Sequence, residues 1–176
     1  MVEVISGSLL DSQAQTLVNT VNCVGVMGKG IALEFKKKFP DMYRDYLDRC
    51  KRGEVRPGSP YLYTTLFPPW ILNFPTKYHW RSRSELSYIV SGLTWIANYW
   101  AELGITSLAL PALGCGNGQL EWSVVAPLIR HHLDKLPIHV ELYAPLDGLP
   151  IRGALPDRES EGLDFSTDGV GPAEGD

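Results

Sequence analysis

The sequence predicts an α/β domain of three layers with a mostly parallel or mixed central sheet. Short runs of β-branched and aromatic residues alternate along the chain with amphipathic helical patterns, which is typical of a sheet covered by helices on both faces. The 176 residues fit one domain of ordinary size. With 44% hydrophobic and 20% charged residues, the composition excludes collagen-like, coiled-coil and wholly disordered chains.

Six segments have the composition of strands, since they are short, rich in aliphatic and aromatic residues, and bounded mostly by Gly, Pro or Ser. In chain order they are Val2–Ile5, Thr16–Val21, Tyr61–Phe67, Trp70–Phe74, Ile105–Leu110 and Ile138–Ala144. The dipeptide Pro68-Pro69 is the expected turn between the third and the fourth of these strands.

Four segments carry apolar residues at helical spacing. In chain order they run from Gly30 to the residue before Pro40, from Asp41 to Gly53, from Ser84 to Gly104, and from Leu120 to Leu136. Asp41 is the expected N-cap of the second helix, because its carboxylate can accept hydrogen bonds from the free N–H groups of the first turn. Ser84 with Glu85 is the expected start of the third helix.

The acidic balance of the chain comes from its last thirty residues. Residues 147–176 contain eight acidic and two basic residues, so the 146 residues before them carry 14 bases against 12 acids. The same segment contains six glycines and three prolines, and Phe165 is its only aromatic residue. Such a segment buries too little apolar area to offset its chain entropy. We therefore expect a mildly basic folded domain over residues 1–146 and a disordered tail or linker over 147–176.

Membrane, disulfide and zinc-ribbon classes are not indicated. Apolar runs stay well short of the roughly 20 residues that span a bilayer, and Met1–Val4 lacks the basic and apolar parts of a signal peptide. Cys23, Cys50 and Cys115 are far apart and form no C-x-x-C pair, so neither a disulfide framework nor a zinc ribbon is expected. The expectation is a cytoplasmic monomer without metal, cofactor or membrane contact.

Two glycine-rich loops lie where α/β proteins usually bind ligands. One covers residues 19–32 and the other residues 111–118, and each connects a strand to a helix. Free backbone amides at a helix N-terminus attract phosphate, and glycines allow a close approach of the backbone. Neither loop fits a Walker loop or the G-x-G-x-x-G fingerprint. One such loop alone is as readily an ordinary turn, but two of them favour a pyrophosphate bound between them.

The two loops, NTVNCVGVMGKGIALEFKKKFP and ALPALGCGNGQLEW, resemble the ADP-ribose-binding loops of macrodomains, and the similarity runs from Val2 to about Pro145. The VNCVGVMGKGIA loop and the NFPTK-x-x-W segment are most similar to the branch that contains the DarG antitoxins and the terminal ADP-ribose protein glycohydrolase. The resemblance implies a three-layer α/β/α macrodomain with a central mixed sheet. It also implies removal of ADP-ribose from thymidine bases of single-stranded DNA, which would reverse a DarT-type toxin partner.

The resemblance places the ADP-ribose site on the two loops and the segments beside them. Asn22 matches the asparagine that binds the distal ribose, and an amide suits a sugar hydroxyl because it donates and accepts. Ser8 replaces the Asp that many macrodomains use for adenine, so backbone groups are expected to dominate there. The implied ligand-binding residues are Ser8, Leu9, Thr20, Val21, Asn22, Gly28, Lys29, Gly30, Ile31, Ala32, Thr76, Leu113, Gly114, Cys115, Gly116, Asn117 and Gly118.

Lys77 matches the catalytic lysine of this branch. Its amine would attack C1 of the distal ribose and expel the base, and water would then hydrolyse the lysyl–ribose adduct. The attack needs a neutral amine, and desolvation or a nearby cation such as Arg81 or Arg83 lowers a lysine pKa. The terminal ADP-ribose protein glycohydrolase carries an acid in its second loop, where Gly118 stands in this chain. The missing acid matters less for a thymine leaving group, because the charge of the thymine imide anion is delocalised over two carbonyls and needs little protonation.

Aromatic and basic residues follow the lysine, which is the composition of a platform for single-stranded nucleic acid. His79, Trp80, Arg81 and Arg83 are the expected DNA-facing residues, whereas Trp70, Phe74 and Tyr88 are interpreted as core. A modified base must leave any stack to be reached, which favours a single strand. Two alternatives remain open, a hydrolase of ADP-ribose linked to protein carboxylates and a non-catalytic ADP-ribose reader.

Overall fold

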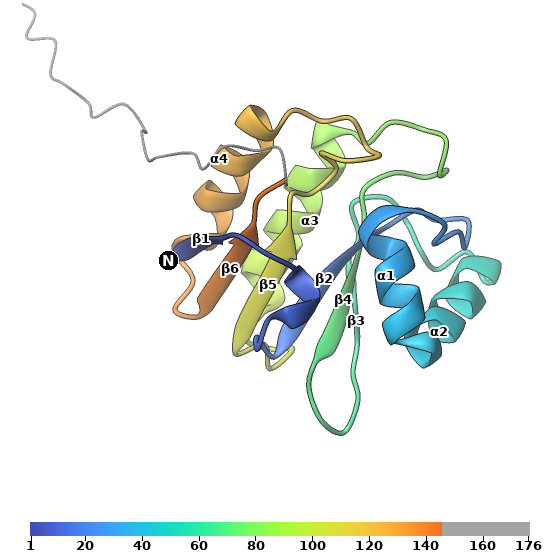
Figure 1. Ribbon diagram of the computed structural model, residues 1–176, viewed down its shortest axis with the longest axis horizontal. Coiled ribbons are helices and arrows are strands. Elements are labelled where there is room, and N and C mark those ends of the chain that lie inside the picture. The colour runs from blue at the N-terminus through green and yellow to red at the C-terminus, as the bar shows by residue number, and fades with distance from the viewer. Residues whose placement is uncertain (146–176) are drawn as a thin grey trace, which may run out of the picture.

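A six-stranded sheet with the strand order β1-β6-β5-β2-β4-β3 runs through the computed structural model, which describes residues 1–145 (Figure 1). Neighbouring strands are parallel except for β3 and β4, which are antiparallel, so the predicted mixed sheet is confirmed. The predicted tail lies outside the described residues. The strands are β1 (Val2–Ile5), β2 (Thr16–Val21), β3 (Tyr61–Tyr63), β4 (Trp70–Pro75), β5 (Ser107–Pro111) and β6 (His139–Tyr143).

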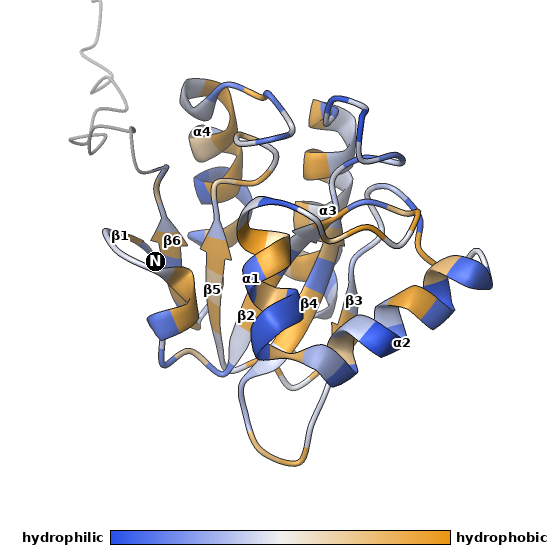
Figure 2. Ribbon diagram, turned by 45° about the vertical axis from the view of Figure 1, so that its right-hand side comes forward, coloured by the Kyte–Doolittle hydropathy of each residue, from blue (hydrophilic) through white to orange (hydrophobic). Residues whose placement is uncertain are grey.

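Two pairs of helices complete the three layers. The helices are α1 (Gly30–Lys38), α2 (Pro40–Lys51), α3 (Leu86–Tyr99) and α4 (Trp122–Leu133). Leu17 packs into the hydrophobic cluster under α1 and α2, whereas Val18 packs into the cluster under α3 and α4, because successive side chains of a strand point to opposite faces. The strands are mostly hydrophobic in Figure 2, and the end of α1 is hydrophilic. Within residues 1–145, no helix combines the length and apolar character that crossing a membrane requires.

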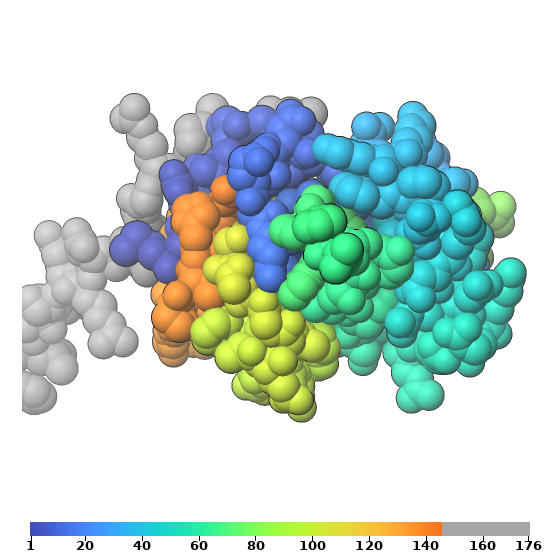
Figure 3. All heavy atoms as spheres, turned by 90° about the horizontal axis from the view of Figure 1, so that it is seen from below, coloured from blue at the N-terminus to red at the C-terminus, as the bar shows by residue number. Residues whose placement is uncertain are grey.

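The segment predicted as one strand over Tyr61–Phe67 forms a strand only up to Tyr63. The Thr65 hydroxyl donates to the Phe67 carbonyl (2.7 Å) and the Trp70 indole N–H donates to the Thr65 carbonyl (3.0 Å), so local bonds replace the sheet ladder. Leu66 and Phe67 are exposed at the tip of this loop, 88% and 75% respectively. The loop lies at the amino ends of the parallel strands, which Figure 3 views directly.

Three helices differ from the predicted ones in their bounds. The second helix starts at Pro40, since proline needs no N–H partner there, and Asp41 lies inside the first turn rather than at the cap. The third helix starts at Leu86, and Ser84 lies before it with its polar groups used in tertiary contacts. The fourth helix covers only Trp122–Leu133. A short 3-10 helix at residues 9–11 was not predicted.

Close packing of α3 on β4 leads to a first testable prediction. A Cβ added at Gly92 would collide with the ring of Phe74, with Cε1 at 2.6 Å and Cζ closer still, and Phe74 is fully buried. We expect Gly92→Ala to lower the free energy of unfolding by about 3 kcal/mol through overpacking. Denaturant unfolding measures this effect, and Ser91→Ala on the exposed side of the same helix is the matched control. A loss below about 1 kcal/mol would contradict the packing.

Candidate active site

Three loops gather at the carboxyl ends of the central strands. Loop 1 (residues 22–29) follows β2, the lysine loop (76–85) follows β4, and loop 2 (112–121) follows β5. Because β2 pairs with both β4 and β5 in parallel, the three loops leave the sheet at the same edge and in adjacent positions (Figure 1). This is the edge at which open α/β sheets bind ligands.

Loop 1 is shaped by the side chain of Asn22, which is only 5% exposed. Its Nδ2 donates to the Val26 carbonyl (2.6 Å), while its Oδ1 accepts from the Val24 N–H (3.1 Å) and the Tyr46 hydroxyl (3.0 Å). Desolvation by burial raises the pKa of Tyr46, so this hydroxyl stays a donor. The amide of Asn22 thus fixes the loop, and its contact with a ribose stays a prediction. The supporting role of Tyr46 was not predicted.

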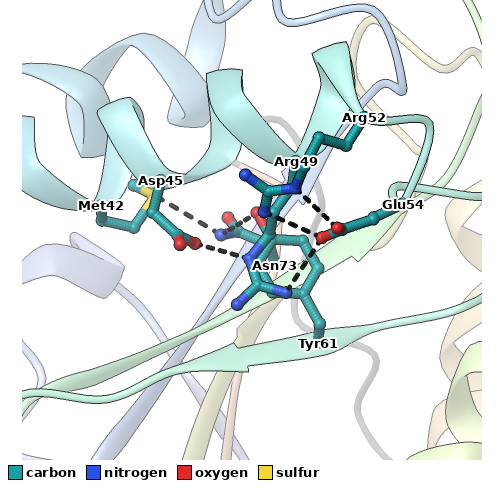
Figure 4. A network of polar contacts seen from close by, with 7 residues as sticks. All are labelled: Met42, Asp45, Arg49, Arg52, Glu54, Tyr61 and Asn73. Carbon is teal, nitrogen blue, oxygen red and sulfur yellow. Dashed lines mark hydrogen bonds and ion pairs between the residues drawn. The ribbon is translucent and has the colours of Figure 1, made fainter.

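A network of buried polar side chains on the sheet contacts loop 1. Asn19 Nδ2 donates to Asn73 Oδ1 (3.0 Å) and lies 3.9 Å from the sulfur of Met27 in loop 1. Asn73 Nδ2 donates to the Tyr61 hydroxyl (3.0 Å), and the Arg49 guanidinium lies 4.6 Å from the centre of the Tyr61 ring (Figure 4). Sequence reasoning missed this network of side chains, because one asparagine in each of two strands gives no periodic signal.

Loop 2 faces loop 1 and leaves little space for side chains. A Cβ added at Gly30, where α1 begins, would lie 3.2 Å from Asn117 Nδ2, so the helix start and loop 2 are neighbours. Gly114 has φ +71°, and a Cβ there would lie 2.8 Å from Leu120 Cδ1 and 3.0 Å from Ser84 Cβ. Gly114 therefore serves a close approach of the backbone, which the sequence predicts for this loop.

The other predicted ligand residues divide into accessible and buried ones. Gly28, Lys29, Gly30, Gly116 and Asn117 are exposed along the facing edges of the two loops. Buried residues are Val21, Asn22, Thr76, Leu113, Gly114 and Gly118, and half-buried ones are Thr20, Ile31, Ala32 and Cys115. Ser8 is exposed, whereas Leu9 packs in the hydrophobic cluster with Met27. The side chain of Leu9 thus serves the core, and only its backbone is left for a ligand.

The side chain of Lys77 extends from the lysine loop to loop 2, and the residue is only 9% exposed. Its Nζ donates to the carbonyl oxygens of Trp80 and Asn117, both at 3.1 Å. Burial lowers the pKa of Lys77, whereas Arg81, which we expected to contribute, lies over the Trp80 ring instead. A neutral amine has two N–H bonds and one lone pair. The two carbonyls can therefore take both N–H bonds and leave the lone pair directed elsewhere.

Backbone hydrogen bonds fix the peptide that carries the lysine. The N–H of Thr76 donates to the Val21 carbonyl (3.1 Å), and the N–H of Cys23 donates to the Tyr78 carbonyl (2.8 Å). Lys77 is thus enclosed by bonds from the residues on either side of it to loop 1 and the end of β2. The arrangement presents one buried, partly desolvated amine beside two glycine-rich loops.

Aromatic and basic side chains form a rim beside the lysine, defined here as Tyr78, His79, Trp80 and Arg81. His79 and Trp80 are stacked, with ring centres 5.4 Å apart, and the Arg81 guanidinium lies 4.5 Å from the Trp80 ring centre. Trp80 is 42% and Tyr78 63% exposed. Arg83 is exposed further along the same loop. These are rigid flat surfaces next to a cation, as base stacking requires.

The cysteines of loop 1 and loop 2, Cys23 and Cys115, are poor nucleophiles. Burial raises the pKa of Cys23 to about 12 and that of Cys115 to about 11, so both stay thiols at neutral pH. Over residues 1–145, no group of three or more His, Cys, Asp or Glu side chains could bind a metal ion. Lys77 is the buried amine beside the two loops, and its catalytic role stays a prediction.

Known proteins resemble this chain in sequence over most of its length. A Macro domain model matches residues 18–129. The DNA ADP-ribosyl glycohydrolase of Mycobacterium tuberculosis is 47% identical over 147 residues, which cover 81% of this chain and 42% of that protein. The DNA ADP-ribosyl transferase-DNA ADP-ribosyl glycohydrolase fusion protein of Thermosipho africanus is 45% identical over 161 residues, with coverage of 81% and 42%. The chain thus spans less than half the length of these relatives.

Solved structures agree with the sequence comparison. The macrodomain of Mycobacterium tuberculosis DarG has a TM-score of 0.79 and 46% identity, and the match covers 82% of this chain and 98% of that one. Thermosipho africanus DarTG in complex with ADP-ribose has a TM-score of 0.79 and 46% identity, with coverage of 84% and 42%. The predicted fold is therefore confirmed, and the chain belongs to the Macro domain family, in which it is similar to the DarG macrodomains.

Proposed function

We propose that this chain is a DNA ADP-ribosyl glycohydrolase, which releases ADP-ribose from thymidine bases of single-stranded DNA. The observation that supports this most is the amine of Lys77, which is 9% exposed and borders loop 2 through Asn117. Relatives named DNA ADP-ribosyl glycohydrolase that are 45–47% identical make the same chemistry reasonable for this chain. The neighbouring rim of His79, Trp80 and Arg81 adds a surface for DNA.

The loops would bind the diphosphate and the lysine would carry out the displacement. Amides at the start of α1, from Gly28 to Ala32, and those of loop 2 would donate to the phosphate oxygens. The lone pair of Lys77 would form a bond to C1 of the distal ribose while the bond from C1 to the thymine nitrogen breaks. The electron pair leaves with the thymine imide. Water then bonds to C1 through its oxygen while the bond from C1 to the lysine nitrogen breaks. A proton of the water passes to the lysine nitrogen and from there to the thymine imide, which restores the neutral amine.

The rate is expected to depend on pH through Lys77. Only the neutral amine attacks, so kcat rises with pH as the lysine loses its proton and levels off above its pKa. Because burial lowers this pKa, the plateau is reached at a pH below the roughly 10.4 of an ordinary lysine. A pH profile of kcat under saturating substrate measures this. A kcat that falls as the pH rises through the neutral range would contradict the nucleophilic role.

The rim is expected to bind the nucleotides next to the modified base. We expect Trp80→Ala to raise KM for ADP-ribosylated single-stranded DNA by about tenfold, the value of one lost stacking contact. Binding of free ADP-ribose stays within about twofold, because the Trp80 carbonyl that accepts from Lys77 is retained. Phe67→Ala is the matched control, since Phe67 is an exposed aromatic residue in the loop at the opposite end of the sheet. Equal effects of both variants would exclude a specific platform.

A paired assay tests the proposed function against its alternatives. Single-stranded DNA ADP-ribosylated on thymidine and a protein ADP-ribosylated on carboxylates are incubated separately with the chain, and free ADP-ribose is measured. Faster release from the DNA supports the proposal. Preferential release from the protein indicates the protein-directed hydrolase, and tight binding of ADP-ribose without release from either substrate indicates a reader.

A DarT-type toxin is the partner that we propose for the full protein. The support is the fusion of a DNA ADP-ribosyl transferase with a DNA ADP-ribosyl glycohydrolase in the Thermosipho africanus relative. An enzyme that removes the modification would counteract one that adds it. We propose that the chain acts on such DNA as a cytoplasmic monomer.

A further inference from the structure

We propose that Ser84 is a positioning residue that fixes loop 2 against Lys77, an inference that rests on the proposed function. Ser84 lies in the lysine loop, before α3, and is only 5% exposed. Its hydroxyl is hydrogen-bonded to the Thr76 hydroxyl (3.1 Å), and its N–H donates to the Gly118 carbonyl (3.0 Å). Thr76 is the neighbour of the lysine in the chain, and Gly118 belongs to loop 2.

These contacts close a ring around the catalytic amine. Lys77 Nζ donates to the Asn117 carbonyl, Asn117 is followed by Gly118, Gly118 accepts from Ser84, and Ser84 is bonded to Thr76. The ring returns to Lys77 through the peptide bond that joins it to Thr76. Two adjacent carbonyls of loop 2 are therefore bound from the lysine loop, one by the amine and one by the Ser84 N–H.

The Ser84 side chain also occupies the space beside Gly118. A Cβ added at Gly118 would overlap the Ser84 hydroxyl oxygen and the Gly114 carbonyl oxygen. Loop 2 can thus close on Ser84 only because residue 118 has no side chain. The Ser84 hydroxyl, which is bonded to Thr76, holds this part of loop 2 at a fixed distance from the Thr76–Lys77 peptide.

The position of Asn117 matters because its carbonyl is one of the two acceptors that orient the amine. With both acceptors in place the lone pair of a neutral Lys77 has one remaining direction. If loop 2 moves by an ångström, the amine loses an acceptor and its lone pair turns away from C1. A misplacement of that size costs on the order of 100-fold in rate.

The test compares Ser84→Ala and Thr76→Val with two conservative controls. We expect each variant to lower kcat by about 10- to 100-fold, while KM for modified DNA and Kd for ADP-ribose change by less than about threefold. Thr76→Ser keeps the hydroxyl, so we expect it to recover about tenfold in kcat relative to Thr76→Val. Ser87→Ala removes an exposed serine from the start of α3 and has no effect. The double variant loses no more than one single variant, since both remove one shared hydrogen bond.

Labelling of the amine gives a readout that does not need turnover. Ser84→Ala is expected to raise the rate at which a small acetylating reagent modifies Lys77 by severalfold, and mass spectrometry of the Lys77 peptide measures it. Unchanged labelling together with a kcat within twofold of wild type would overturn the inference while leaving the proposed function intact. Parallel losses of ADP-ribose binding and kcat would overturn it too, because they would assign Ser84 to the pocket. If Ser84→Ala does not fold, Thr76→Val decides by the same measurements.

Discussion

Lys77→Ala is expected to slow the release of ADP-ribose from DNA by about 1,000-fold or more, a loss typical of removing a nucleophile. Binding of free ADP-ribose changes by less than about threefold, because the loops rather than the amine would bind the diphosphate. Truncation leaves the Trp80 and Asn117 carbonyls without this donor, but both residues are exposed, so water can replace the amine. Single-turnover release and calorimetric binding measure the two quantities.

Lys77→Arg is the matched control for charge. A guanidinium keeps a positive charge in the site but does not lose its proton, so it has no lone pair for attack. We expect this variant to be as inactive as Lys77→Ala. Activity within tenfold of wild type in either variant would exclude covalent catalysis by the lysine and would favour direct attack by water on C1.

The order of elements and the position of the loops could be predicted from the sequence. The run Trp70–Phe74 is apolar except for Asn73, and Thr16–Val21 is rich in β-branched residues, which is typical of strands in a buried sheet. The glycine-rich loops follow β2 and β5, so the edge at which they meet followed from parallel pairing alone. The third strand was predicted too long, because Thr64–Phe67 has strand composition but closes on itself through side-chain bonds.

The contacts of the candidate site could not be predicted in the same way. The partners of Lys77 are backbone carbonyls, and every residue carries one, so the sequence gives no signal for the two that are used. The sequence predicts Ser84 as the start of a helix, but its side chain makes a tertiary hydrogen bond instead. The two roles have the same sequence signal, because the residue types that cap helices also make tertiary hydrogen bonds. The side chain of Asn22 bonds within its own loop and also accepts from Tyr46, which is 24 positions away in the chain.

Substitutions at Gly118 are expected to have the second largest effect on the reaction. Both Gly118→Ala and Gly118→Asp would force loop 2 away from Ser84 and the Gly114 carbonyl, because a Cβ at this position overlaps both. The cost of overpacking is about 2 kcal/mol of unfolding free energy, which corresponds to a fall of roughly 5 °C in the unfolding midpoint. Displacement of the Asn117 carbonyl beside it lowers kcat by about 100-fold.

The aspartate variant separates loop geometry from acid chemistry. If the missing carboxylate alone limited hydrolysis of the lysyl adduct, Gly118→Asp would speed turnover. The structure leaves no space for a Cβ at this position, so we expect Gly118→Asp to lose as much activity as Gly118→Ala. Gly116→Ala is the control for the unfolding midpoint, since nothing lies within 4 Å of a Cβ there. A Gly118→Asp variant at or above wild-type turnover would show that loop 2 opens to accept an acid, and that the closed contact with Ser84 is not needed for the reaction.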